Sequence, residues 1–253
     1  MIQIQNLTAG YHDQPVLQDL SLTIPKGAVT AIVGPNGCGK TTLLRAICHQ
    51  LPQTDGEINI GGKDIACYAR KELARTVAVL PQVRDVPVLT VEALVQHGRY
   101  PHLGMHRRLT AKDKTIVSQA MEQTDVKKLS QQELRELSGG QRQRSYIAMA
   151  LAQDTPIILL DEPTTHLDLS RQFALLSLIR SLKAAGKTIV MVLHDLGHAL
   201  QYCDHLVLLE GGKLIQAGTP ATLLESGALE RVFGIQIQQT QDGFLFHPQR
   251  KEG

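Results

Sequence analysis

Short, nearly continuous apolar runs recur along the chain, and the segments between them are long enough to hold helices. Such a run is typical of a β-strand that is covered on both faces of a parallel sheet. We therefore predict an α/β core. Its predicted strands are residues 28–33, 76–80, 157–160, 188–193 and 205–209.

The N-terminal segment has a different pattern. Ile2 and Ile4 alternate with polar residues, and the same alternation continues through residues 16–24. A period of two residues predicts strands that are covered on one face only. The start of the chain is therefore expected to form β-structure distinct from the core.

Helical spacing appears between the predicted strands. Residues 170–185 carry apolar side chains at helical intervals, and Gly186 is suited to end that helix. Thr110 and Asp113 resemble a capping box, with Asp in the place of Glu, that opens another helix. Because no strand candidate lies between residues 90 and 152, we predict a helical subdomain inserted between two strands of the core.

Composition excludes several classes of protein. With 43% hydrophobic residues the chain is too apolar to be disordered, and a net charge of +2 gives no bulk attraction to nucleic acid. Only 4% of residues are aromatic and none is Trp, so stacking platforms for single strands are not expected. No signal peptide and no apolar run of about 20 residues is present, so we expect any membrane pathway to lie on another chain. The four cysteines are expected to be reduced, as in a cytosol: Cys38, Cys48, Cys67 and Cys203.

A phosphate-binding loop follows residues 28–33. The segment fits the pattern G-x-x-x-x-G-K-[ST], with a strand before it and a helical run after it. The loop N–H groups and the helix start favour phosphate, Lys40 can reach the β- and γ-phosphates, and the Thr41 hydroxyl can bind Mg²⁺. The alternative is a glycine-rich turn with a chance lysine. The loop comprises Gly34, Pro35, Asn36, Gly37, Cys38, Gly39, Lys40, Thr41 and Thr42.

Cys38 stands inside this loop, close to the expected start of a helix. A helix N-terminus can lower the pKa of a thiol. We therefore expect Cys38 to be susceptible to alkylation, without a catalytic role.

Two acids end the predicted strand 157–160. Ligands of such sheets bind at the carboxyl ends of the strands. Asp161 is placed to hold Mg²⁺, and Glu162 is placed to polarise an attacking water. The alternative is a strand-end cap, with Pro163 as the terminator.

A second anion-binding pattern is the sequence Leu-Ser-Gly-Gly-Gln at residues 137–141, directly before a helical run. Together with the phosphate loop it resembles the signature of the ABC ATPase family. The resemblance implies that Ser138, Gly139, Gly140 and Gln141 contact nucleotide.

The same resemblance implies a fold of the α/β class. It would have a P-loop NTPase (RecA-like) core, an N-terminal antiparallel β subdomain and an inserted α-helical subdomain. Residues 1–253 would form a single ABC ATPase domain. Its parts would be the core with the β subdomain at 1–88 and 155–215, the helical subdomain at 89–154, and a C-terminal extension at 216–253.

Further roles are implied residue by residue. Tyr11 is similar to the aromatic residue that stacks on adenine, although simple packing is the alternative for a lone Tyr. Gln82 resembles the glutamine that contacts Mg²⁺ and water. His194 resembles the switch histidine at the γ-phosphate, and Asp168 the loop that communicates across a dimer. The implied catalytic residues are Lys40, Gln82, Glu162 and His194, and the implied Mg²⁺ ligands are Thr41, Gln82 and Asp161.

The chain carries one phosphate loop and one signature. In the family that it resembles, each ATP lies between the loop of one subunit and the signature of the other, so the resemblance implies a head-to-tail homodimer that closes on ATP and Mg²⁺. Residues 91–102, 109–113, 144–155 and 161–168 are similar to those of the ATPases of the iron–siderophore, haem and cobalamin importers. This likeness implies a peripheral protein on the cytoplasmic face of the plasma (inner) membrane. Its partners would be a separate transmembrane permease and, indirectly, a solute-binding protein, with no nucleic acid. The alternative is a soluble ABC-type ATPase with a mechanical or regulatory role and no permease.

Overall fold

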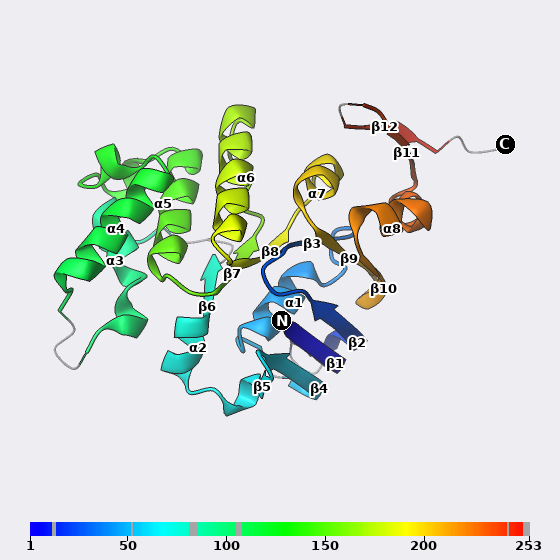
Figure 1. The fold of residues 1–253 in the computed structure, drawn as a ribbon, viewed down its shortest axis with the longest axis horizontal. Coiled ribbons are helices and arrows are strands. Elements are labelled where there is room, and N and C mark those ends of the chain that lie inside the picture. The colour runs from blue at the N-terminus through cyan, green and yellow to red at the C-terminus, as the bar shows by residue number, and fades with distance from the viewer. Residues whose placement is uncertain (12–13, 52, 81–85, 105–107, 242, 250–253) are drawn as a thin grey trace. The chain divides into compact units, whose positions relative to one another are not determined.

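The computed structural model describes residues 1–11, 14–51, 53–80, 86–104, 108–241 and 243–249. The chain forms two compact units, whose elements are labelled in Figure 1. The first unit is Met1–Cys67 with Val190–Gly253, and the second unit is Tyr68–Ile189. These limits differ from the predicted subdomain at 89–154, since the second unit also contains strands; the predicted domain bounds stay a prediction.

Antiparallel strands begin the first unit. β1 (Ile2–Tyr11) pairs with β2 (Gln14–Ile24) on one side and with β4 (Gln53–Ile60) on the other, and β5 (Lys63–Asp64) completes the order β2-β1-β4-β5. In β2 the apolar residues predicted from the alternation are buried and the intervening ones are largely exposed. The predicted N-terminal β-structure is confirmed.

Parallel strands follow in the first unit. β3 (Val29–Val33) is buried at every residue and pairs in parallel with β9 (His205–Glu210), which pairs antiparallel with β10 (Lys213–Gly218). The order here is β10-β9-β3-β8. The remaining elements of this unit are α1 (Lys40–Ile47), the single turn Ile65–Cys67, α7 (Leu196–Tyr202), α8 (Pro220–Glu225), α9 (Ala228–Phe233), and the hairpin of β11 (Ile235–Gln239) and β12 (Phe244–Pro248).

The second unit contains β6 (Val77–Leu80) and β7 (Ile157–Asp161), which pair in parallel, and its order is β8-β7-β6. β8 (Thr188–Val192) runs across the boundary between the units. β7 and β8 are buried throughout, as predicted for strands covered on both faces. The helices are α2 (Arg70–Thr76), α3 (Val91–His97), α4 (Ala111–Gln123), α5 (Gly139–Ala152) and α6 (Leu169–Ala184), with single turns at Tyr100–His102, Lys127–Leu129 and Leu134–Glu136.

The inserted helical segment is confirmed for the residues described. Between residues 90 and 152 these contain helices and one isolated β-bridge, Thr90 with Glu133, but no strand. The predicted capping box of α4 is also present. Thr110 accepts a hydrogen bond from the Asp113 N–H, and Asp113 in return accepts one from the Thr110 N–H at 2.9 Å.

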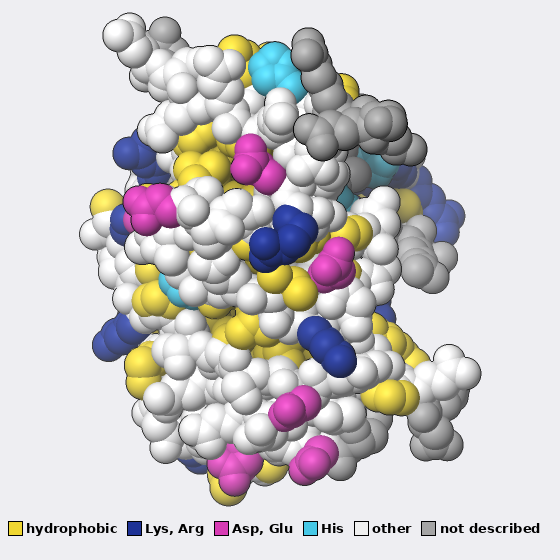
Figure 2. Space-filling view, turned by 90° about the vertical axis from the view of Figure 1, so that its right-hand side faces the viewer, with side chains coloured by type: hydrophobic (Ala, Val, Ile, Leu, Met, Phe, Trp, Pro, Cys, Tyr) yellow, Lys and Arg dark blue, Asp and Glu magenta, His cyan; other side chains and the backbone are white. Residues whose placement is uncertain are grey.

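Charge is dispersed on the face drawn in Figure 2. Acidic and basic side chains are scattered there among apolar and uncharged ones, in line with the net charge of +2. Among the described residues, the helices are all too short or too polar to cross a membrane.

Candidate functional site

The predicted phosphate loop joins β3 to α1 in the first unit. Its glycines adopt backbone conformations that other residues avoid, with φ of 150° at Gly34, 77° at Gly37 and 100° at Gly39. A Cβ on Gly34 would lie 2.1 Å from the carbonyl oxygen of Leu209, and one on Gly39 would lie 2.7 Å from the Leu17 side chain. The loop therefore needs glycine for both conformation and space.

Lys40 is buried and its side chain turns back into the loop. The ammonium donates hydrogen bonds to the carbonyl oxygens of Gly34 and Pro35, each at 2.8 Å. A phosphate oxygen would be a stronger, charge-assisted acceptor than either carbonyl. The loop thus holds its cation where an anion enclosed by the loop would meet it.

The start of α1 suits an anion as well. Its N-cap residue is Gly39, so no side chain caps the first turn, and no acidic residue lies in that turn. Backbone N–H groups at an uncapped helix start favour negative charge. Thr41 is half-buried and Thr42 is buried in this turn. The residues present therefore fit a phosphate group.

The expectation for Cys38 is wrong. Its side chain is only 3% exposed, and burial raises the pKa of the thiol, an effect that the Lys40 ammonium offsets only in part. Desolvation of the thiolate therefore outweighs the helix start. Cys38 is a shielded thiol with a raised pKa, which does not predispose it to alkylation.

Tyr11 ends β1 and is half-buried. Arg45 of α1 donates a hydrogen bond to the Tyr11 hydroxyl at 2.8 Å, and its guanidinium carbon lies 5.9 Å from the ring centroid. This contact fastens Tyr11 to the helix that carries the phosphate loop. Sequence reasoning missed Arg45, because nothing local links it to a residue so far away. Stacking of Tyr11 on adenine stays a prediction.

His194 follows β8 and is exposed. The N–H of Leu193 donates to the carbonyl oxygen of Ile32 at 3.3 Å, so His194 follows a strand that lies beside the one leading into the loop. Asp195 caps α7 by accepting from the His198 N–H at 2.9 Å, which explains the His-Asp pair at this strand end. Gln82 lies outside the described residues.

The two predicted carboxylates lie in the second unit. Asp161 is the last residue of β7 and is 6% exposed. Glu162 has φ of 51°, a conformation that a residue other than glycine keeps only where its surroundings hold it. Gln143 of α5 is part of those surroundings, since its amide donates to the carbonyl oxygen of Pro163 at 3.3 Å. Sequence reasoning missed Gln143.

The signature segment begins α5. Ser138 is the N-cap and accepts from the Gln141 N–H at 3.3 Å, while Gln141 accepts from the Ser138 N–H at 2.9 Å. Gln141 therefore caps its own helix, which the spacing S-x-x-Q could have indicated. A Cβ on Gly140 would lie 3.1 Å from the His166 carbonyl oxygen, so the signature glycine lets α5 approach the segment before α6.

Asp168 is the N-cap of α6 and is exposed. Its carboxylate accepts from the Ser170 hydroxyl at 2.7 Å and from the Arg171 N–H at 2.9 Å. These hydrogen bonds, led by that of Ser170, lower the pKa of Asp168. The second unit thus holds Asp161, Glu162, the signature and Asp168, and the first unit holds the phosphate loop, Tyr11 and His194.

Comparison with known proteins gives a consistent result. The family model described as ABC transporter matches residues 17–165. The chain is 41% identical to the achromobactin transport ATP-binding protein CbrD of Dickeya dadantii, over 98% of this chain and 93% of that protein. It is 43% identical to the ferric enterobactin transport ATP-binding protein FepC of Escherichia coli, over 94% and 89%. Among solved structures, a dimeric bacterial ABC transporter cassette superposes with a TM-score of 0.78 at 27% identity, covering 87% of this chain and 99% of that one.

Proposed function

Because this chain belongs to the ABC transporter family and is an ATPase, we propose that it energises an importer of iron–siderophore complexes or of a related metal chelate such as haem or cobalamin. The phosphate loop with its inward-turned Lys40 carries the ATPase part of this proposal. Relatives named for achromobactin and ferric enterobactin transport, alike over nearly the full chain, support the cargo class.

In this function the loop N–H groups and Lys40 hold the phosphates of ATP. Glu162 orients the attacking water, and His194 contacts the γ-phosphate. Tyr11 stacks on the adenine. Mg²⁺, bound through Thr41, Gln82 and Asp161, would neutralise phosphate charge.

The working form is a head-to-tail pair of identical chains. Each chain carries one phosphate loop, before the α1 start at Gly39, and one signature segment, at the α5 start at Ser138. Two copies satisfy both, because the signature of each then covers the nucleotide held by the other. The dimeric state of the similar cassette supports this arrangement.

The dimer would close on ATP and open after hydrolysis, and this motion would drive permease subunits on separate chains at the cytoplasmic face of the plasma membrane. A solute-binding protein would deliver the chelate from the other side. The cargo is selected by those proteins, so its identity has to be measured on the assembled importer.

One variant tests the dimer. Glu162→Gln should bind Mg-ATP, hydrolyse it poorly and elute as a dimer in size-exclusion chromatography, since the nucleotide that joins the chains persists. The exposed Glu225→Gln in α8 is the matched control and should behave as wild type. A Glu162→Gln protein that stays monomeric with saturating Mg-ATP would count against the head-to-tail dimer.

A second experiment tests the cargo. Cells with and without the gene are compared for uptake of labelled iron–siderophore, haem and cobalamin. We expect uptake of one of these chelates to depend on the gene and to be lost with Lys40→Ala. Gene-independent uptake of all three, together with normal ATPase activity, would favour a soluble ABC-type ATPase without a permease.

A further inference from the structure

Asp125 occupies a backbone position where glycine would be easier. It follows Thr124, the C-cap of α4, and has φ of 53°. Helices commonly end with a left-handed residue at this position, and glycine is preferred there because it has no Cβ. An aspartate at such a site suggests that its side chain has a use.

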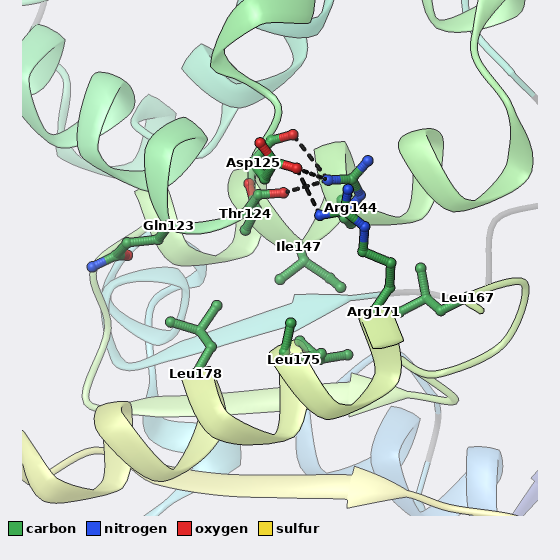
Figure 3. A pocket seen from close by; sticks show the side chains of 10 residues that line it. Gln123, Thr124, Asp125, Arg144, Ile147, Leu167, Arg171, Leu175 and Leu178 are labelled. Carbon is green, nitrogen blue, oxygen red and sulfur yellow. Dashed lines mark hydrogen bonds and ion pairs between the residues drawn. The ribbon is translucent and has the colours of Figure 1, made fainter. Parts of the chain in front are cut away.

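The Asp125 carboxylate joins two helices. Its Oδ2 accepts two hydrogen bonds, one from Arg144 of α5 at 2.9 Å and one from Arg171 of α6 at 2.7 Å (Figure 3). Arg144 also donates to the Asp125 carbonyl oxygen at 2.9 Å. The two guanidinium groups, that of Arg171 first, lower the pKa of Asp125, so the bridge remains ionised at neutral pH.

A cavity of about 60 Å³ lies beneath this bridge. Apolar side chains line its floor, with Ile147 from α5 and Leu175 and Leu178 from α6 (Figure 3). Empty space forfeits dispersion contacts between the side chains that face it. The bridge spans the rim of this cavity and joins α5 to α6 there.

Both helices start at residues that matter for the proposed function. Ser138 caps α5 and Asp168 caps α6. The two helix starts already meet once, where Gly140 lies close to the His166 carbonyl. The Asp125 bridge adds a link through Arg144, in the second turn of α5, and Arg171, in the first turn of α6, and it restricts their mutual angle further.

We propose that Asp125 is a positioning residue for ATP turnover, because its carboxylate holds α5 and α6 so that Ser138 and Asp168 approach the second copy of the chain as one body. This inference rests on the proposed function, in which both residues act in the closed dimer. Asp125 would act only through Arg144 and Arg171, so its role is positioning and not catalysis.

Asp125→Gly separates positioning from stability. Glycine suits the left-handed backbone, and the Asp125 side chain, which makes both lost ion pairs, is 65% exposed. Arg144, whose side chain is 15% exposed, keeps its hydrogen bonds to the carbonyl oxygens of residues 124 and 125. We expect the melting temperature to stay the same or rise, the Kd for ATP to change less than about twofold, and kcat to fall at least about fivefold. A purely structural residue would not give this combination.

Asp154→Gly is the matched control. Asp154 also follows a helix C-cap, has φ of 51°, and pairs with Lys187 at 2.8 Å, but it does not contact α6 through any hydrogen bond described here. Asp154→Gly therefore also replaces an aspartate by glycine at a left-handed position, and it removes one ion pair. Its kcat should remain within about twofold of wild type.

A double-mutant cycle completes the test. Arg171→Ala should lower kcat as Asp125→Gly does, and the double variant should lose little more than the worse single one, since both break one link. Wild-type turnover in Asp125→Gly, an equal loss in Asp154→Gly, or additive losses in the cycle would overturn the inference. A wild-type protein without ATPase activity would instead overturn the proposed function, and this inference with it.

Discussion

Removal of one partner from the buried ion pair in the helical segment, Arg99 with Asp113, should cost the folded protein several kcal/mol of stability. Arg99 and Asp113 meet at 2.9 Å, and their side chains are only 6% and 9% exposed. Arg99 also donates to the carbonyl oxygen of Ala152 at the end of α5 at 2.8 Å. The hydrogen bond from the Thr110 hydroxyl, followed by other contacts that include Arg99, lowers the pKa of Asp113 to about 2.

Arg99→Met removes the cation and keeps much of the side-chain volume. An exposed pair would contribute about 1 kcal/mol at most, whereas removal of one partner from a buried pair costs about 3–5 kcal/mol. The low exposure of both side chains selects the second range. Because Thr110 still donates to Asp113, we expect the lower end, about 3 kcal/mol.

Urea unfolding followed by circular dichroism at pH 7 measures this loss. A thermal scan should show a melting temperature about 6–12 °C lower, at about 2–4 °C per kcal/mol for a chain of this size. Lys127→Met is the control, since Lys127 pairs with Glu122 on the surface and its side chain is 52% exposed. Its effect should stay below about 0.5 kcal/mol.

A second variant decides whether the cost comes from a stranded charge. In Arg99→Met/Asp113→Asn no buried carboxylate is left unpaired, so the double variant should be more stable than Arg99→Met alone. A loss below about 1 kcal/mol for Arg99→Met, or a double variant that is no more stable than it, would refute the reasoning.

Three further predictions follow from the same structure. The pKa of Asp113 in the folded protein is about 2, below its usual value of 3.8. The ionised carboxylate therefore contributes fully to the free energy of unfolding above pH 3.8, and this contribution is lost as the pH falls toward 2. Urea titrations should show that the free energy of unfolding of Asp113→Asn depends less on acid pH than that of the wild type. Gly140→Ala should lower both the melting temperature and the ATPase rate, since the new Cβ lies 3.1 Å from the His166 carbonyl oxygen; unchanged values for both would argue against this contact. With maleimide at pH 7, peptide mapping should find the exposed Cys67 modified well before Cys38, which is buried and has a raised pKa; equal rates would show that Cys38 is accessible.

Local patterns were sufficient for much of the core and for the chemical motifs. Continuous apolar runs predicted β3, β6, β7, β8 and β9, because a strand covered on both faces has no polar face to place. The phosphate loop and the capping box at Thr110 and Asp113 were equally readable, since all their members lie within a few residues of one another. Such elements are determined by short-range stereochemistry.

Other elements gave no local signal. The first five residues of β4, 53–57, are polar or glycine, so its pairing with β1 depends on the neighbouring strand. The hairpin of β11 and β12 was missed for the same reason. In β12, Leu245 remains 50% exposed, and a polar, weakly patterned segment predicts neither strand.

The amino-acid sequence by itself determined which residues could bind phosphate, end a strand or start a helix, because those abilities depend on near neighbours. Only the tertiary structure decided that Cys38 is shielded, that Arg45 holds Tyr11, that Gln143 supports the turn after β7 and that Asp125 joins α5 to α6. Each of these depends on burial or on a partner distant in the chain. Desolvation and long-range contacts arise only when the backbone folds, so local patterns in the sequence do not predict them.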